Sequence, residues 1–97
     1  MLRVVSHPEA DEELEAAALW YDKRESGLED DFIDDFELAL SRILQAPQPA
    51  RFIQGENRKL NFNRFPYAVI YESQPDILYV KTVMPLHRRP FYWRHRQ

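Results

Sequence analysis

The residues of this chain that could do chemistry are basic and aromatic, and they lie after residue 57. Arginine and lysine can bind phosphate oxygens, and an aromatic ring beside them can stack on a nucleic-acid base. The same side-chain types can bind an acidic peptide or protein surface. A third interpretation needs no ligand, because the rings could cap the core while the arginines balance acidic helices. The candidates are Arg58, Lys59, Arg64, Lys81, Arg88, Arg89, Tyr92, Trp93, Arg94 and Arg96.

Charge is distributed unevenly along the chain. Residues 1–50 contain 13 Asp and Glu against 4 Lys and Arg, whereas residues 51–97 contain 3 against 9. The formal net charge of −3 therefore combines an acidic half of −9 with a basic half of +6. This asymmetry indicates an anionic partner for the basic half. Alternatively, acidic helices and a basic sheet neutralise each other within one fold.

Composition disfavours several other kinds of site. The chain has no cysteine, which removes disulfides, thiol catalysis and cysteine-ligated metals. His7, His87 and His95 are not at ligand spacing, so we expect no metal and no cofactor. Glycine-rich phosphate loops and the G-x-S-x-G motif are absent. The acidic side chains could pair as acid and base, but their spacing fits solvated helix faces.

Length and hydropathy predict one cytoplasmic domain. A chain of 97 residues with 44% apolar residues can build a single core, which would span residues 1–97. It has no apolar run of about 18 residues, so we expect no membrane span. The apolar stretch at the N-terminus is too short for a secretory signal.

Hydrophobic periodicity predicts a strand at residues 2–6 and two helices after it. The first helix begins at His7 or Pro8 and ends near Glu25, and the second has its cap at Ser26 and ends before Pro47. The apolar stripe of the first helix consists of Ala10, Leu14, Ala17 and Tyr21, and that of the second of Leu28, Phe32, Phe36, Ala39 and Ile43.

After a loop predicted at residues 47–57, the pattern changes to alternation. It predicts strands at residues 58–62, 67–72 and 77–84, the last at the centre of a sheet. The order β-α-α-β-β-β predicts an α+β fold, in which an αα-hairpin packs on one face of a small antiparallel-rich sheet. Both faces of the last two strands are apolar, so the sequence leaves open which of them meets the helices.

Four segments together resemble the RelE/ParE superfamily, the toxins of bacterial type II toxin–antitoxin pairs, which include plasmid stabilisation proteins. They are ADEELEAAALWY at residues 10–21, Gly27-Leu28 with Phe32, RFPYAVIY at residues 64–71 and RRPFYWRHR at residues 88–96. They follow the family's order over nearly the whole chain, and the resemblance implies the same β-α-α-β-β-β fold. One position departs from the family, because Pro85 stands where many members have a histidine.

The resemblance implies one of two activities. RelE-like members cut mRNA in the ribosome without a metal, whereas ParE-like members poison DNA gyrase and are not known to catalyse a reaction. The long helical hairpin, the RFPY segment and the Tyr-Trp ending favour the ParE-like activity, and the acidic helices would repel ribosomal RNA. For RelE-like cleavage, the catalytic candidates are Arg64, Arg88, Arg89 and Tyr92. The candidates for binding the target or the antitoxin are Arg58, Lys59, Lys81, Trp93, Arg94 and Arg96.

Either activity implies a cognate antitoxin whose C-terminal segment folds on the toxin. The basic half predicts an acidic antitoxin segment, added at a sheet edge or laid as a helix in an apolar groove. A non-toxic binding module of the same fold remains a third possibility, with Pro85 marking the lost activity. The sequence leaves open the target, gyrase or the ribosome with mRNA, as well as the antitoxin and the oligomeric state.

Overall fold

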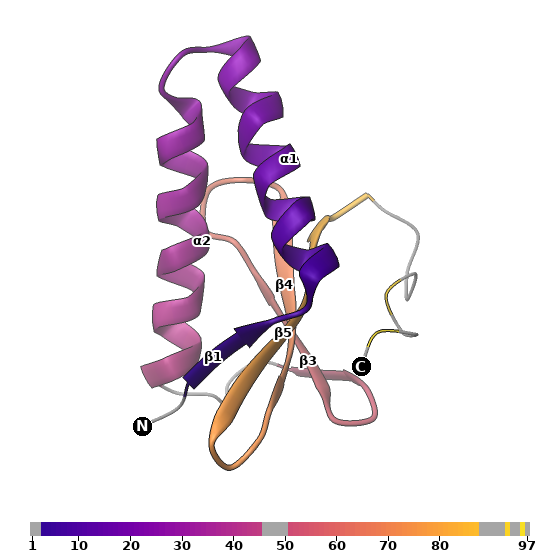
Figure 1. Cartoon of the computed structure of the whole chain (residues 1–97). Coiled ribbons are helices and arrows are strands. Elements are labelled where there is room, and N and C mark those ends of the chain that lie inside the picture. Colours follow the sequence, from indigo (N-terminus) through magenta and orange to yellow (C-terminus); the bar gives the residue numbers. More distant parts are fainter. Residues whose placement is uncertain (1–2, 46–50, 88–92, 94–95, 97) are drawn as a thin grey trace.

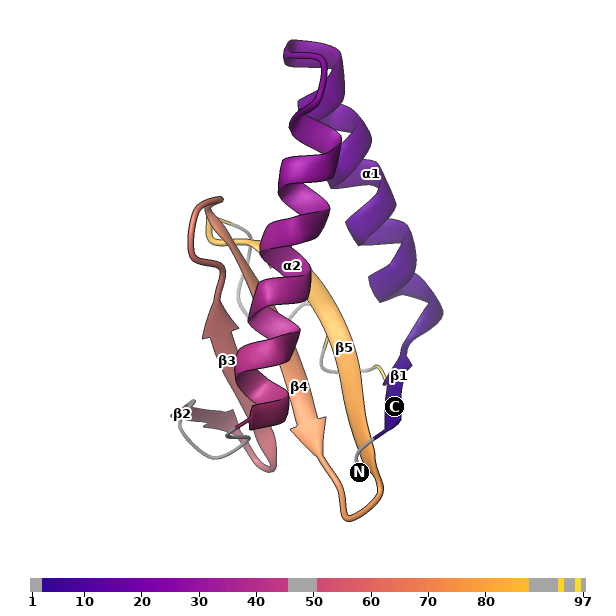
Figure 2. The ribbon, with the colours of Figure 1, turned by 90° about the vertical axis from the view of Figure 1, so that its left-hand side faces the viewer.

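Two antiparallel helices cover one face of a five-stranded sheet (Figures 1 and 2). The computed structural model describes residues 3–45, 51–87, 93 and 96. The elements are β1 (Arg3–Ser6), α1 (Pro8–Arg24), α2 (Leu28–Gln45), β2 (Arg51–Gln54), β3 (Asn57–Asn61), β4 (Tyr67–Ser73) and β5 (Ile77–Pro85). The strand order is β1-β5-β4-β3-β2, with β1 parallel to β5 and the other pairs antiparallel. The α+β class and the element order are as expected, apart from one additional strand.

The additional strand is β2, which lies where a loop was expected. It pairs with β3 in antiparallel register, with Arg51 opposite Lys59 and Phe52 opposite Arg58. Gly55 has φ 55°, the left-handed conformation that a tight hairpin turn requires. The prolines of the expected loop precede the strand, and Gly55 follows it. The turn residues therefore mark the borders of a short strand rather than a continuous loop.

The two helices are capped differently. His7 caps α1, since its Nδ1 accepts the Glu9 N–H at 3.1 Å, and the helix begins at Pro8, one of the two expected starts. The expected cap at Ser26 is wrong. Asp22 reaches across from α1, and its Oδ1 accepts the N–H groups of Gly27 at 2.9 Å and Glu29 at 3.4 Å. A side chain of the preceding helix thus takes the place of a local cap.

A β-bulge in β5 decides which side chains meet the helices. Val80 lies opposite Tyr71, but Thr82 lies opposite Ile70, so Lys81 is the extra residue. The bulge restarts the alternation, and Val80 and Val83 both join the core beneath the helices. The other face carries a second cluster of Ala68, Ile70, Met84 and Trp93.

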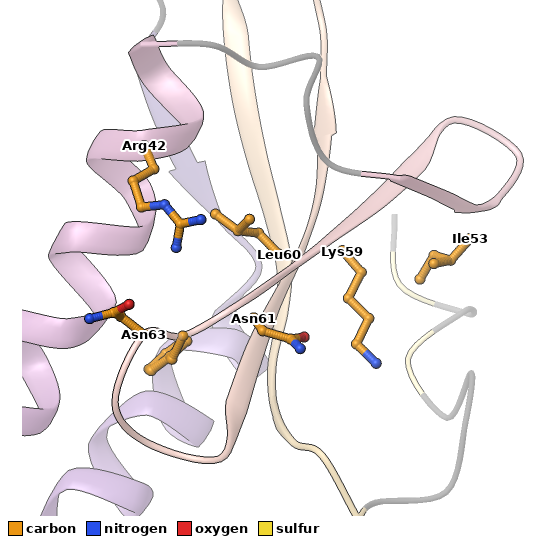
Figure 3. A pocket seen from close by; sticks show the side chains of 7 residues that line it. Arg42, Ile53, Lys59, Leu60, Asn61 and Asn63 are labelled. Atoms are coloured by element: carbon orange, nitrogen blue, oxygen red, sulfur yellow. The ribbon is translucent and has the colours of Figure 1, made fainter.

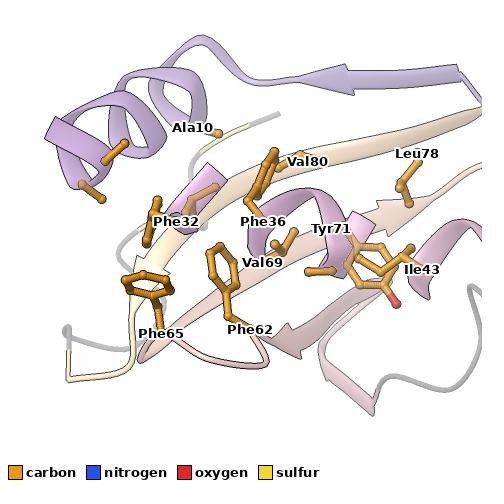
Figure 4. Packing of buried hydrophobic residues seen from close by; sticks show 14 residues of the cluster. Ala10, Phe32, Phe36, Ile43, Phe62, Phe65, Val69, Tyr71, Leu78 and Val80 are labelled. Atoms are coloured by element: carbon orange, nitrogen blue, oxygen red, sulfur yellow. The ribbon is translucent and has the colours of Figure 1, made fainter. Parts of the chain in front are cut away.

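An aromatic cluster joins the helices to the turn between β3 and β4 (Figure 4). Phe32 of α2 is fully buried at its centre. Its ring centroid lies 5.4 Å from Tyr21, 5.4 Å from Phe62, 5.1 Å from Phe65 and 4.9 Å from Tyr67. The predicted stripes of both helices face this core. Neither described helix is long and apolar enough to cross a membrane.

Candidate functional site

The candidate residues do not form one cluster in the described part of the chain. Arg88, Arg89, Tyr92 and Arg94 lie outside the described residues. The others are distributed over the turn between β3 and β4, both faces of the sheet and the side of α1. Their surroundings indicate what each can do.

Arg64 lies on the turn between β3 and β4, among carboxylates of α2. Its Nη1 is 3.2 Å from Asp31 Oδ2, and its guanidinium lies 5.1 Å from the centroid of the Phe65 ring. Asp35 Oδ2 accepts the backbone N–H groups of Arg64 and Phe65, each at 2.9 Å. Asp35 is buried, which corrects the expectation that the acidic residues of this helix occupy only solvated faces. A phosphate approaching Arg64 would therefore meet several negative charges.

Lys81 and Arg58 belong to the sheet. Lys81 is the bulged residue of β5, and its Nζ lies 3.2 Å from Glu72 Oε1 with both side chains largely covered. Arg58 lies opposite Tyr71 in the β3–β4 register. Burial raises the pKa of the Tyr71 phenol, and the charge of Arg58 opposes that rise. The charge of Lys81 is thus close to the Glu72 carboxylate, and that of Arg58 acts on the Tyr71 phenol.

Arg96 and Trp93 attach the C-terminal segment to the body of the protein. Trp93 is 1% exposed in the cluster on the outer face of the sheet. Arg96 Nη1 lies 2.9 Å from Glu13 Oε1, and Nη2 lies 2.9 Å from Glu9 Oε2. Both side chains are buried within the chain, and their expected role in binding a partner stays a prediction.

The Arg96 and Glu13 side chains bind backbone groups of β5 at an edge where no described strand pairs with it. The pairing of β1 with β5 ends at Val80, so the next part of β5 has no strand neighbour on that side within the described ranges. Arg96 Nη1 donates to the Lys81 carbonyl at 3.0 Å, and the Val83 N–H donates to Glu13 Oε1 at 3.2 Å. The two side chains satisfy backbone groups that would otherwise be unpaired.

A groove on the side of α1, lined by described residues, is more apolar than a second hollow at the edge of β3. It has a volume of about 440 Å³ and lies between α1 and the ends of β4 and β5; we call it the α1 groove. Trp20 lines it, is 50% exposed and carries the Arg24 guanidinium 3.6 Å from its ring centroid. The lining residues are Glu13, Ala16, Ala17, Trp20, Tyr21, Pro66, Tyr67, Val83, Pro85 and His87.

Sequence reasoning did not select Trp20 as a candidate. Its position could have indicated an exposed aromatic side chain, since Trp20 precedes Tyr21 and so falls outside the buried stripe of its helix. Pro85, the position that departs from the family pattern, lines the same groove.

Burial raises the pKa of the Tyr67 phenol, with a further rise from Tyr21, whose own pKa is also raised by burial. Both phenols are therefore neutral near pH 7 and can donate hydrogen bonds but not act as bases.

The second large hollow lies at the edge of β3 and has a volume of about 490 Å³ (Figure 3); we call it the β3-edge hollow. Two cations line it, Lys59 of β3 and Arg42 of α2. Sequence reasoning missed Arg42 because it belongs to the acidic half of the chain. The remaining lining residues are Ile53, Leu60, Asn61, Phe62 and Asn63.

Metal-ligating side chains do not gather in the described ranges, where no three His, Asp or Glu residues are placed to hold one ion.

Comparison with known proteins shows the fold. Neither protein-family models nor curated proteins give a match to the sequence. A solved structure described as "Chromosomal ParDE TA system from P. aeruginosa" contains a chain with a TM-score of 0.75 to this one. The two chains are 15% identical, and the alignment covers 88% of this chain and 96% of the other. The expected RelE/ParE-like fold is thereby confirmed.

Proposed function

We propose that this chain is the toxin of a bacterial type II toxin–antitoxin module and that it poisons DNA gyrase as ParE-like toxins do. The likeness to a chain of a ParDE system over most of both chains supports the toxin role. One observation of the structure adds support to the preference for gyrase over mRNA cleavage. Three of the cations expected to serve phosphate chemistry or binding, Arg64, Lys81 and Arg96, are paired with carboxylates.

Metal-independent RNA cleavage needs cations that are free to stabilise charge as it develops on the phosphate. Arg64 is the described residue that the resemblance assigns to this task. It would have to leave Asp31, and the phosphate would come close to Asp34 and Asp35, which line the same hollow. That arrangement opposes an oxyanion instead of stabilising it.

Binding to a protein surface does not require cations that are free to stabilise charge on a phosphate. It needs an exposed aromatic or apolar anchor beside a groove that a partner side chain can enter. Trp20 supplies the anchor, and the neighbouring Leu19 is 52% exposed. We therefore place the main partner contact, with gyrase or with the antitoxin, at the α1 groove.

Expression in a bacterial host tests the toxin role. We expect growth arrest and rescue by the product of the neighbouring gene. Unchanged growth would instead support the non-toxic binding module.

Two assays on one preparation test the target. Gyrase supercoiling and ribosome-dependent mRNA cleavage are run side by side, each with and without the antitoxin. We expect lost supercoiling and intact mRNA. Cut mRNA with normal supercoiling would overturn the gyrase assignment and make this chain a RelE-like endoribonuclease.

A matched pair of variants tests the α1 groove. Trp20→Ala should weaken supercoiling inhibition or antitoxin binding by about 30-fold, the effect of a typical interface anchor. Leu44→Ala is the control, because Leu44 is 41% exposed on α2 and does not line the groove. Equal effects of the two variants on both readouts would remove the α1 groove from the proposal.

A further inference from the structure

We propose that Arg24 positions the Trp20 ring at the α1 groove, so that this wall of the groove is in place before a partner binds. The Arg24 guanidinium lies 3.6 Å from the centroid of the Trp20 ring, which is a direct stacking contact. This role deepens the proposed function and rests on it for the partner that the groove binds. It adds a residue that acts through Trp20 and does not itself touch the partner.

The contact follows from the positions of the two residues on α1. Trp20 and Arg24 are four residues apart, so their side chains lie one above the other on the same face of the helix. Long helical side chains point back toward the N-terminus of the helix, which directs the guanidinium of the last residue of α1 over the ring one turn earlier. The helix itself therefore brings the two groups together.

No described carboxylate holds the guanidinium away from the ring. Arg24 forms no ion pair within the described part of the chain, although Asp22 and Glu25 are close in sequence. The Asp22 carboxylate instead accepts the N–H of Gly27. The charge of Arg24 does act on Tyr21, where it opposes the rise that burial produces in the pKa of the phenol. Arg24 is thus associated with the aromatic residues at the end of α1.

Tyr21 restrains the same ring from a second side. The centroids of Trp20 and Tyr21 are 4.9 Å apart and their planes are at 88°, which is an edge-to-face contact. Tyr21 in turn stacks on Phe32 at 5.4 Å and meets Phe65 at 4.8 Å. Although Trp20 is 50% exposed, it therefore contacts the buried aromatic cluster on one side and Arg24 on another. Together the two contacts favour a single orientation of the ring.

The α1 groove has this restrained ring in its wall. Trp20 and Tyr21 line the groove, whereas Arg24 is not among its described lining residues. The guanidinium thus covers the ring from outside the groove and leaves the groove open to a partner side chain. A side chain that is already ordered loses less conformational entropy when a partner binds. Arg24 is therefore expected to strengthen binding without contacting the partner.

Two other roles for Arg24 predict different behaviour of its variants. A direct ion pair with the partner would require only a positive charge, and so would a favourable interaction with the carbonyl end of α1. Lysine carries that charge but lacks the planar guanidinium that stacks on a ring. Arg24→Lys therefore separates stacking from charge, whereas Arg24→Gln removes both.

Fluorescence of the purified chain tests the orientation of the ring. Trp93 is the other tryptophan and is 1% exposed, and its signal is measured in Trp20→Phe and subtracted. In Arg24→Gln we expect the anisotropy decay of Trp20 to gain a component from local motion on the picosecond-to-nanosecond scale, and acrylamide quenching to increase. Lys23→Gln is the matched control, because Lys23 is an exposed cation that lies over no described ring. Unchanged anisotropy and quenching in Arg24→Gln would overturn the positioning role, whether or not the chain is a toxin.

Binding to purified gyrase, or to the product of the neighbouring gene, tests the consequence for the partner. Arg24→Gln should weaken binding by about three- to tenfold, the range expected when one side chain must be ordered on binding. Arg24→Lys should recover only part of that loss. In the Trp20→Ala background, Arg24→Gln should have no further effect, because Arg24 acts through the ring.

An equal loss in both backgrounds, or full recovery by Arg24→Lys, would show that Arg24 acts by its charge and would overturn the positioning role. A wild-type chain that binds neither gyrase nor the product of the neighbouring gene would contradict the proposed function. The fluorescence comparison would then still decide whether Arg24 orients Trp20.

Discussion

Asp35 provides a quantitative test of how the turn between β3 and β4 is held against α2. Its carboxylate is 6% exposed and accepts the backbone N–H groups of Arg64 and Phe65, each at 2.9 Å. In an Asp35→Ala variant, both donors lose this partner. Since this turn also positions Arg64, its stability bears directly on the candidate site.

The magnitude follows from the two hydrogen bonds. A hydrogen bond to a charged group contributes about 1.5–3 kcal/mol, and a buried donor left without a partner incurs its full desolvation cost. Phe65 is buried, so its N–H should incur that cost, whereas water can reach the exposed Arg64. We expect Asp35→Ala to lower the free energy of unfolding by about 2–4 kcal/mol, a large part of the roughly 5–15 kcal/mol of a typical domain. Asp35→Asn keeps a neutral acceptor and should lose about half as much.

Urea unfolding followed by far-ultraviolet circular dichroism measures the difference, provided that the slope of the transition is unchanged. Asp34→Ala is the control, because it removes the same charge from an exposed position on the same helix. Both alanine variants gain the same small helix propensity, so that gain cancels in the comparison. If Asp35→Ala lies within about 0.5 kcal/mol of Asp34→Ala, the two hydrogen bonds do not hold the turn and the reasoning is refuted.

Three further predictions concern the ion pair of Arg96, alkaline pH and the helix–helix turn. Arg96→Ala leaves Glu13 without its ion-pair partner and should lower the free energy of unfolding in urea by about 3 kcal/mol, so a loss below about 1 kcal/mol would contradict a stabilising role of this pair. Burial raises the pKa of Tyr71 above its ordinary value of 10.0, so the unfolded chain loses this proton first and stability falls as the pH rises above that value. Tyr71→Phe should flatten that pH dependence, and an unchanged slope would argue against the raised pKa. Gly27 has φ 97° and open space where a Cβ would lie, so Gly27→Ala should lower the free energy of unfolding by about 1–2 kcal/mol from backbone strain alone. Thermal unfolding measures the change, and an unchanged stability would contradict that strain.

The local sequence pattern was sufficient to predict the helices and the fold class. The stripes from Ala10 to Tyr21 and from Leu28 to Ile43 each repeat with the helical period, and both lie against the sheet. Cap and break signals at His7 and Pro8 are short-range, because the groups that satisfy them are within a few residues. The same holds for the alternation that predicted β3 and for the short apolar runs that predicted β4 and β5.

The strand β2 and the facing of the sheet depended on partners distant in the chain. Arg51–Gln54 is too short and irregular to indicate a strand by itself, and it becomes one by pairing with β3. The bulge at Lys81 shifts the alternation of β5 relative to β4. Because β4 and β5 are apolar on both faces, no periodicity could reveal that shift.

The roles of the charged residues were likewise decided only in three dimensions. A carboxylate in a helix has the same sequence signature whether it is solvated, as Asp34 is, or buried against a turn 29 residues away, as Asp35 is. Arg96 finds Glu13 across 83 residues. The sequence by itself determined where the helices, most strands and the charges lie along the chain. The tertiary structure decided which cations are neutralised and which remain available, because the strength of a charge–charge contact depends on distance in space and on burial rather than on sequence separation.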